Sequence, residues 1–218
     1  MIRPFIRFKK VDVAIMIGIA VVVVVALAVV LSAGGPNPLR TRILTIGDLP
    51  AGWTAGPTQT STLDQPGSAC LPGPAKKQPA VAVSDTASFY DGAGLPVLGE
   101  YLALDTKASV SFKRDERALA GCHTLTFTQS GRTFRATIKP LALGPMASSS
   151  AAFTLQFTDE GLPIVTDLVL FADPTHIGVV VYADSAAPSV NAIAGISDEA
   201  ENKAEGRPVT PAVVSISA

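Results

Sequence analysis

The sequence predicts an α+β protein in which a membrane-spanning helix precedes an antiparallel sheet packed with two helices. Three observations lead to this prediction. Residues 13–31 form an apolar run without a charge, several segments after residue 80 alternate apolar and polar residues, and residues 105–122 and 189–204 repeat apolar residues at helical spacing. Consecutive strands with helices between and after them are typical of an α+β fold with antiparallel pairing.

The composition excludes several classes of protein. The 218 residues are 48% hydrophobic and only 16% charged, which excludes a disordered chain. The 18 glycines and 17 prolines would interrupt a long coiled coil. A formal net charge of −1 argues against a nucleic-acid partner, because nucleic-acid binding needs a basic face.

The apolar run near the N-terminus has the length of a membrane span. Val13–Leu31 holds 19 residues, and about 20 cross a hydrocarbon core. Basic residues precede the run at positions 3, 7, 9 and 10, and only Arg40 and Arg42 follow closely, so the N-terminus is expected in the cytoplasm. An uncleaved anchor is favoured, because the apolar region of a signal peptide has only about 7–15 residues. A removed signal peptide is the alternative.

The span divides the chain. We expect a cytoplasmic stub at 1–10, a transmembrane signal-anchor helix at 11–33, a tether at 34–42, an extracytoplasmic domain at 43–205 and a tail at 206–218. The part after the span carries 13 basic and 17 acidic residues, a net charge of −4, so it would not adhere to an anionic membrane by charge. The predicted localisation is the cell membrane, with a single pass and an extracytoplasmic C-terminal domain.

Cys70 and Cys122, the two cysteines of the chain, both fall in the predicted outer part, where disulfide bonds persist. A bond between them would close a loop of about 50 residues and stabilise the fold by about 4 kcal/mol on the chain-entropy model. Two unpaired thiols are the alternative. A metal site is not expected, because only His123 adjoins a cysteine and the chain has no CxxC motif. No cofactor is predicted.

The best-defined strand pair is a hairpin about Ser130-Gly131. Pairing 123–129 with 133–139 sets Phe127 opposite Phe134 and places the apolar partners on one face, as a real hairpin requires. Further strands are expected at 81–90, 97–104, 152–158, 164–171 and 177–183. The last two are apolar on both faces and should lie centrally in the sheet.

Two helices complete the prediction. Asp105 is expected to cap the first helix, whose charged residues 113–116 should face mostly water. The second helix runs from Ser189 to Ala204. Its acidic residues are expected mostly on the face opposite its apolar residues: Asp198, Glu199, Glu201 and Glu205.

The sequence offers little catalytic chemistry. A serine or cysteine nucleophile would need His123 or His176 as its base, and none of the common hydrolase, zinc or phosphate-binding motifs is present. Asp159, Glu160 and Asp173 fall in turns, where charges are usually solvated. We therefore predict that the protein is not an enzyme. The enzyme alternative is a hydrolase of the cell envelope that uses paired carboxylates.

Two residues are singled out as candidate ligand contacts or core anchors. Glu100 interrupts the apolar run Val97–Leu104, either as a buried acid facing a ligand or as the exposed side of an edge strand, and the edge strand is favoured. Trp53 either stacks on a ligand such as a sugar or anchors the core where the tether meets the domain, and the core anchor is favoured.

Four short segments carry a resemblance to a known family. They are Leu-Pro-Ala-Gly-Trp at 49–53, Cys70 in a polar loop, Leu-Gly-Glu-Tyr at 98–101 and Ala-Leu-Ala-Gly-Cys at 118–122. Over about residues 43–204 the chain resembles the extracellular sensor-like domain of actinobacterial PknH-type kinases and their membrane-anchored or lipoprotein relatives. The resemblance implies a twisted antiparallel sheet with helices, a cleft suspected of ligand binding and no established enzymatic activity.

The chain departs from the kinases, since it has one cysteine pair where the kinase domain is thought to have two, and it has no kinase domain. Only ten residues precede the predicted anchor helix, so any signalling is expected to need a partner. The predicted function is a membrane-anchored, sensor-like domain of the cell envelope that binds a lipid or glycan ligand or a protein partner. The alternative is a structural or interaction protein without a small ligand.

Overall fold

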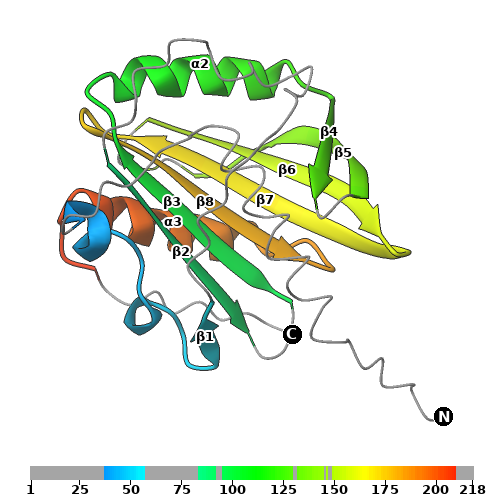
Figure 1. The fold of residues 1–218 in the computed structure, drawn as a ribbon, viewed down its shortest axis with the longest axis horizontal. Coiled ribbons are helices and arrows are strands. Elements are labelled where there is room, and N and C mark those ends of the chain that lie inside the picture. Colours follow the sequence, from blue (N-terminus) through cyan, green and yellow to red (C-terminus); the bar gives the residue numbers. More distant parts are fainter. Residues whose placement is uncertain are drawn as a thin grey trace.

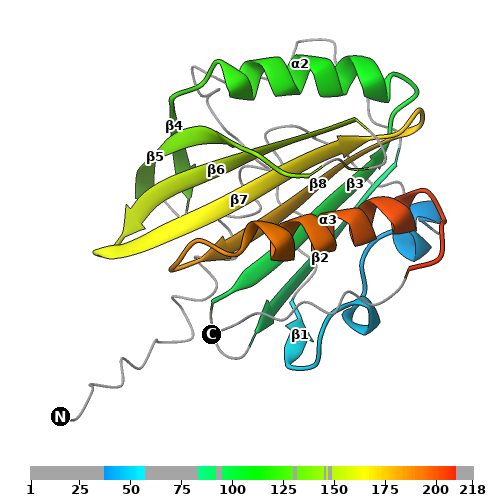
Figure 2. The same cartoon turned by 180° about the vertical axis from the view of Figure 1, so that it is seen from behind.

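An eight-stranded antiparallel sheet with one α-helix on each face forms the body of the molecule (Figures 1 and 2). The computed structural model describes residues 37–56, 83–91, 95–129, 132–144, 146 and 149–209. The predicted α+β class and antiparallel sheet are confirmed for this part of the chain. The predicted anchor helix at 11–33 and Cys70 lie outside the described residues. No helix among the described residues is long and apolar enough to cross a membrane.

The strand order is β1-β2-β3-β8-β7-β6-β5-β4, and every neighbouring pair is antiparallel. The strands are β1 (Trp53–Ala55), β2 (Ser84–Asp91), β3 (Val97–Leu104), β4 (Thr124–Gln129), β5 (Arg132–Leu141), β6 (Ser149–Asp159), β7 (Leu162–Ala172) and β8 (His176–Asp184). Strands β4 to β8 follow one another as a meander that returns to pair with β3. The chain reaches the far edge of the sheet from β3 through helix α2 (Ala108–Ala120).

The register of the predicted hairpin is confirmed. Phe127 lies opposite Phe134 and Leu125 opposite Ala136 in the β4–β5 pair, and Ile138 N–H donates to the His123 carbonyl at 3.2 Å. The central position of β7 and β8 is also confirmed, because each pairs with a strand on both sides. Strand β1 and two short 3-10 helices, η1 (Pro38–Thr41) and η2 (Ile46–Asp48), were not predicted.

Helix α2 covers the face of the sheet formed by β5 to β8, with Phe112 and Leu119 in the core between them. The prediction that residues 113–116 face mostly water is wrong for Asp115, which is buried. Its position three residues after Phe112 and four before Leu119 falls on the inward stripe of the helix. Its carboxylate accepts hydrogen bonds from Arg114 Nε at 2.7 Å and Nη2 at 3.1 Å, so the buried charge is paired.

Helix α3 (Val190–Ala204) covers the other face over β7 and β8. Its predicted start is confirmed, because the Ser189 hydroxyl accepts the Ala192 N–H at 3.1 Å as an N-cap. The predicted acidic outer face is wrong for Glu199 and Glu201, which are both buried. The spacing of the apolar residues correctly indicated which side of this helix is buried. It did not indicate that the buried side is wide enough to include Glu199 and Glu201.

Gly178 in β8 is required by the packing under α3. It pairs with Phe171 of β7, and a Cβ atom at position 178 would overlap with the Phe171 ring. Phe171 is almost fully buried, so its ring has no free space into which to move. The glycine therefore makes room for an aromatic ring in the core.

We expect Gly178→Ala to lower the free energy of unfolding by about 1–3 kcal/mol, since overpacking forces side chains and backbone to shift. Urea unfolding followed by circular dichroism measures the change. Gly144→Ala is the matched control, because nothing lies within 4 Å of a Cβ at that exposed position. Equal stabilities for the two variants would contradict the packing argument.

Candidate functional site around Glu100

Residues 37–49, which we call the N-terminal joint, pack against the α3-side face of the sheet. Leu39, Leu44 and Leu49 are buried in the core on this side. Burial of each such side chain contributes roughly 1.5–3 kcal/mol. The Asn37 side-chain amide also donates to the Ser84 carbonyl of β2 at 2.8 Å. The segment predicted as a tether and domain start is therefore built into the core.

The joint is also tied to the C-terminal end of α3. Arg42 Nη1 donates to the Ala204 carbonyl at 2.9 Å, and Lys203 forms an ion pair with Asp48. Asp48 accepts further hydrogen bonds from the Thr45 N–H at 2.6 Å and the Thr45 hydroxyl at 2.7 Å. Burial alone would raise the pKa of Asp48, but these hydrogen bonds and Lys203 lower it below its usual 3.8.

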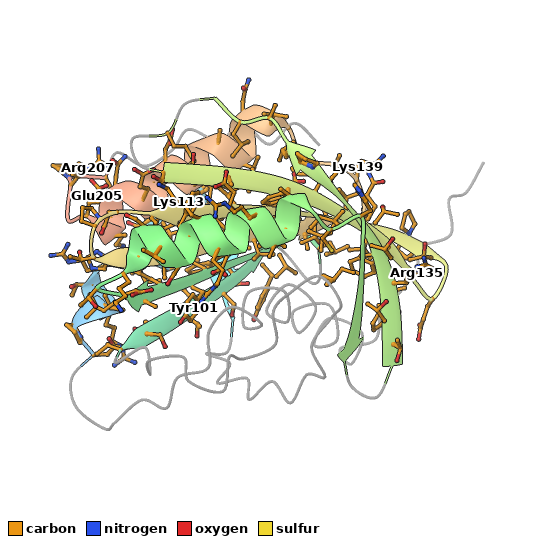
Figure 3. The ribbon with its side chains drawn as sticks, turned by 90° about the horizontal axis from the view of Figure 1, so that it is seen from above. Tyr101, Lys113, Arg135, Lys139, Glu205 and Arg207 are labelled. Atoms are coloured by element: carbon orange, nitrogen blue, oxygen red, sulfur yellow. The ribbon has the colours of Figure 1, made fainter. Side chains whose placement is uncertain are left out.

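Figure 3 shows where the C-terminal end of α3 lies in the molecule. Glu205 and Arg207, which follow α3 and form an ion pair at 2.6 Å, lie at one end of the molecule, and Arg135 and Lys139 of β5 lie toward the other. The joint meets α3 at the Glu205 end. The contact between joint and helix is thus remote from the β4–β5 hairpin.

Glu100 lies at the contact between the joint and the sheet. It sits on β3, opposite Ala87 of β2 and Val180 of β8, and is only 2% exposed. The favoured interpretation as the exposed side of an edge strand is therefore wrong, because β3 has a strand on each side and the joint covers its face. Glu100 Oε2 accepts the Leu44 N–H at 2.6 Å.

The second carboxyl oxygen of Glu100, Oε1, is buried and has no hydrogen-bond partner in the described part of the chain. Burial raises the pKa of Glu100 to about 8, against the lowering effect of the Leu44 N–H. Lys203 lowers the pKa further, and Asp48 and Asp85 raise it. Glu100 is therefore mostly protonated at neutral pH, and a neutral carboxyl can both donate and accept a hydrogen bond.

Trp53, the other residue singled out, is a core residue at the start of β1. It is 7% exposed, and its ring contacts the buried ring of Tyr182 edge-on at a centroid distance of 6.4 Å. Trp53 and Glu100 face the same core, between the sheet and α3, but no described contact joins them. Tyr182 was not singled out from the sequence, because it lies in the uncharged run 177–183 of β8.

Two more polar groups on this side of the sheet were missed or left without a role. Asp167 of β7 is buried, accepts the Thr154 hydroxyl at 2.6 Å, and has a pKa raised by burial. Ser197 of α3 is fully buried, and its hydroxyl has no partner among the described residues. On the α3 side of the sheet, Ser197 Oγ and Glu100 Oε1 thus have no hydrogen-bond partner among the described protein groups, and such buried atoms are usually paired with protein or ordered water.

His176 is engaged in stabilising the β7–β8 turn. Asp173 Oδ1 accepts the N–H groups of Thr175 at 2.6 Å and His176 at 2.7 Å, and Asp173 Oδ2 lies 2.8 Å from His176 Nδ1. The prediction of solvated turn charges is wrong for Asp173 and also for Asp159, which are both buried, whereas Glu160 is exposed. A carboxylate that closes a tight turn has a structural role.

The described residues include no group of three or more His, Cys, Asp or Glu side chains that could hold a metal ion. His123 is exposed at the start of β4. Cys122 is buried after α2, and the described part of the chain contains no free cysteine. Because Cys70 lies outside that part, its pairing with Cys122 stays a prediction.

Comparison with known proteins gives one match. No protein-family model matches the chain, and no curated protein does. The fold is similar to the crystal structure of the extracellular domain of PknH from Mycobacterium tuberculosis, with 10% sequence identity, a TM-score of 0.45, and coverage of 57% of this chain and 63% of that domain. The predicted resemblance is confirmed to this extent, and the chain spans less than two thirds of the domain it matches.

We expect Asp173→Ala to lower the free energy of unfolding by about 1–3 kcal/mol at pH 6, because buried N–H groups lose their acceptor. Burial acts to raise the pKa of Asp173, but its hydrogen bonds hold it below 3.8. The stabilisation is thus fully present above about pH 4 and is lost as the pH falls through the lower folded-state pKa. The difference between wild type and variant should shrink from pH 6 to pH 2 in urea titrations.

Glu116→Ala on α2 is the control, since this half-exposed carboxylate should change stability by less than about 0.5 kcal/mol. A constant loss at both pH values in Asp173→Ala would show that the carboxylate charge is not the stabilising group.

Proposed function

We propose that the protein is a single-pass, membrane-anchored, extracytoplasmic domain that binds a ligand or a protein partner and has no catalytic activity of its own. The observation that carries the proposal is the buried carboxyl of Glu100. One of its oxygens holds the joint, and the other lacks a partner among the described residues.

The anchoring part of the proposal rests on the sequence and on the joint. The apolar run Val13–Leu31 with its basic flank favours a span, and the joint begins six residues after that run. Leu39 and Leu44 are almost fully buried in the core. A domain attached in this way would be held close to the membrane surface, at a short distance set by the few residues between anchor and core.

The binding part rests on incomplete hydrogen bonding. Buried polar atoms are nearly always paired, so exceptions are places where a water, an ion or a ligand completes the hydrogen bonds. Glu100 Oε1 and Ser197 Oγ are two such atoms in the core between the sheet and α3. A ligand with hydroxyl or carbonyl groups, such as a glycan or a lipid headgroup, could complete them.

Native mass spectrometry of the full chain, purified in detergent from its own cells, tests the proposal. We expect the mass of the uncleaved chain together with a copurifying lipid or glycan, and loss of that species in Glu100→Gln but not in Lys113→Ala, an exposed position on α2. A bare protein in every preparation would contradict ligand binding and favour the interaction protein without a small ligand. A chain that lacks its first 33 residues would contradict the anchor.

The disulfide bond is a second part of the extracytoplasmic proposal. Non-reducing peptide mapping should recover Cys70 and Cys122 in one linked peptide, because disulfides persist outside the cytoplasm. Reduction should lower the free energy of unfolding by about 4 kcal/mol on the chain-entropy model. A Cys70→Ser, Cys122→Ser double variant is the control, since reductant should not change its stability. Free thiols at both positions in the native protein would contradict the predicted disulfide bond.

A further inference from the structure

The hydrogen bond between Leu44 and Glu100 joins two parts of the chain that are 56 residues apart. It connects the joint, which follows the predicted anchor, to the third strand of the sheet. We propose that the protonation state of Glu100 controls how tightly the N-terminal joint is held on the sheet, so that acidification tightens the link between anchor and domain and a rise in pH loosens it. This regulation rests on the proposed function, since it acts on the same site.

The geometry explains why the charge of Glu100 matters. With the joint in place, the carboxyl is 2% exposed, it receives one N–H donor on Oε2, and Oε1 has no partner among the described residues. An ionised carboxylate in this place would be a buried charge with a single hydrogen bond, which is strongly unfavourable. When the joint opens, water reaches the carboxyl and removes that cost. Ionisation therefore favours the open joint.

The charges that act on Glu100 come from the elements around it. Lys203 of α3 favours the ionised form, and Asp48 of η2 and Asp85 of β2 oppose it. On β8, the residue opposite Glu100 is Val180, which carries no charge. Lys203 is already paired with Asp48, so it does not neutralise Glu100 directly. Neither histidine is among the groups that act on Glu100.

The direction and range of the effect follow from linkage. The pKa of Glu100 is about 8 in the closed joint and near its usual 4.5 when water reaches it. The closed form keeps its proton between these values and the open form loses it, so the equilibrium constant for opening should rise about tenfold per pH unit between roughly 5 and 8. Above about pH 8 both forms are ionised, and the constant should level off.

Hydrogen exchange at the Leu44 amide measures this opening. The experiment uses the full chain in detergent micelles between pH 5 and 9, with wild type and Glu100→Gln compared at each pH. Gln keeps an acceptor for the Leu44 N–H and does not titrate, so the rate ratio cancels the intrinsic pH dependence of exchange. We expect the ratio of wild type to variant to rise about tenfold per pH unit from roughly 5 to 8 and then level off. A ratio that is flat with pH would overturn the proposal.

Leu39→Ala is the matched control. It removes an almost fully buried apolar contact of the joint without changing any charge, so it should speed exchange at Leu44 by one factor at every pH and keep the slope of the wild type. Loss of the slope in Leu39→Ala would overturn the assignment to Glu100.

The Leu155 amide in the paired strand β6 is an internal reference within the wild-type protein. After correction for intrinsic exchange, its exchange rate should not show the pH dependence of the Leu44 rate. This comparison needs only the wild-type protein, so the proposal can still be tested if Glu100→Gln does not fold. Parallel exchange at Leu44 and Leu155 would indicate opening of the whole domain and would overturn the proposal. If the Leu44 exchange-rate ratio is flat with pH but a ligand copurifies, the pH regulation is overturned and the proposed ligand binding stands. If the ratio rises with pH but the protein carries no ligand, the ligand binding is overturned and the pH regulation stands.

Discussion

The central strands carry mostly apolar residues on both faces, and the two helices and the N-terminal joint keep water from these faces. Strands β3, β8 and β7 lie in the middle of the sheet, and nearly every side chain on them is buried. Helix α2 covers one face. On the other face, α3 covers β7 and β8. The N-terminal joint covers the part of this face that β2 and β3 form. The segment after the predicted anchor is therefore a necessary part of the core.

Glu100 departs from this apolar arrangement, as Asp167 of β7 also does, and its place explains its chemistry. Adjacent positions on the same face of β3 are Leu98 and Leu102, so the carboxyl lies in an apolar layer. A leucine at position 100 could fill this space, but it could not accept the Leu44 N–H, which would then be buried without a partner. Because a single backbone donor satisfies one oxygen only, the carboxyl fixes the joint and retains unused hydrogen-bonding capacity. Attachment of the joint and unused hydrogen-bonding capacity thus come from one side chain.

Local patterns predicted those parts of the fold that depend on near neighbours in the chain. The alternation in 123–139 contained the hairpin register, and Ser189 marked the start of α3, because turns and caps are determined within a few residues. The burial of Glu100 depends on Leu44, which is 56 residues away in the chain. A pattern read over a few neighbouring residues cannot predict such a contact. Asp173 was misjudged because a carboxylate in a turn looks the same in sequence whether it faces water or closes the turn. Asp167 interrupts the apolar run 164–171 as Glu100 interrupts 97–104, so the same signal could have identified it, whereas nothing in the apolar run 177–183 marks Tyr182 as the contact of Trp53.

The way in which the joint is fastened has a mechanical consequence. Its ties to the sheet and to α3 are side-chain contacts and a few single hydrogen bonds, whereas the strands beneath it are held by continuous backbone ladders. A pulling force applied to the N-terminal end of the joint would therefore detach the joint before it separated any central strand. The 13 residues from 37 to 49 would then add about 45 Å of extended chain, at roughly 3.3–3.6 Å per residue. The chain would in this way lengthen by that amount while its sheet stays folded.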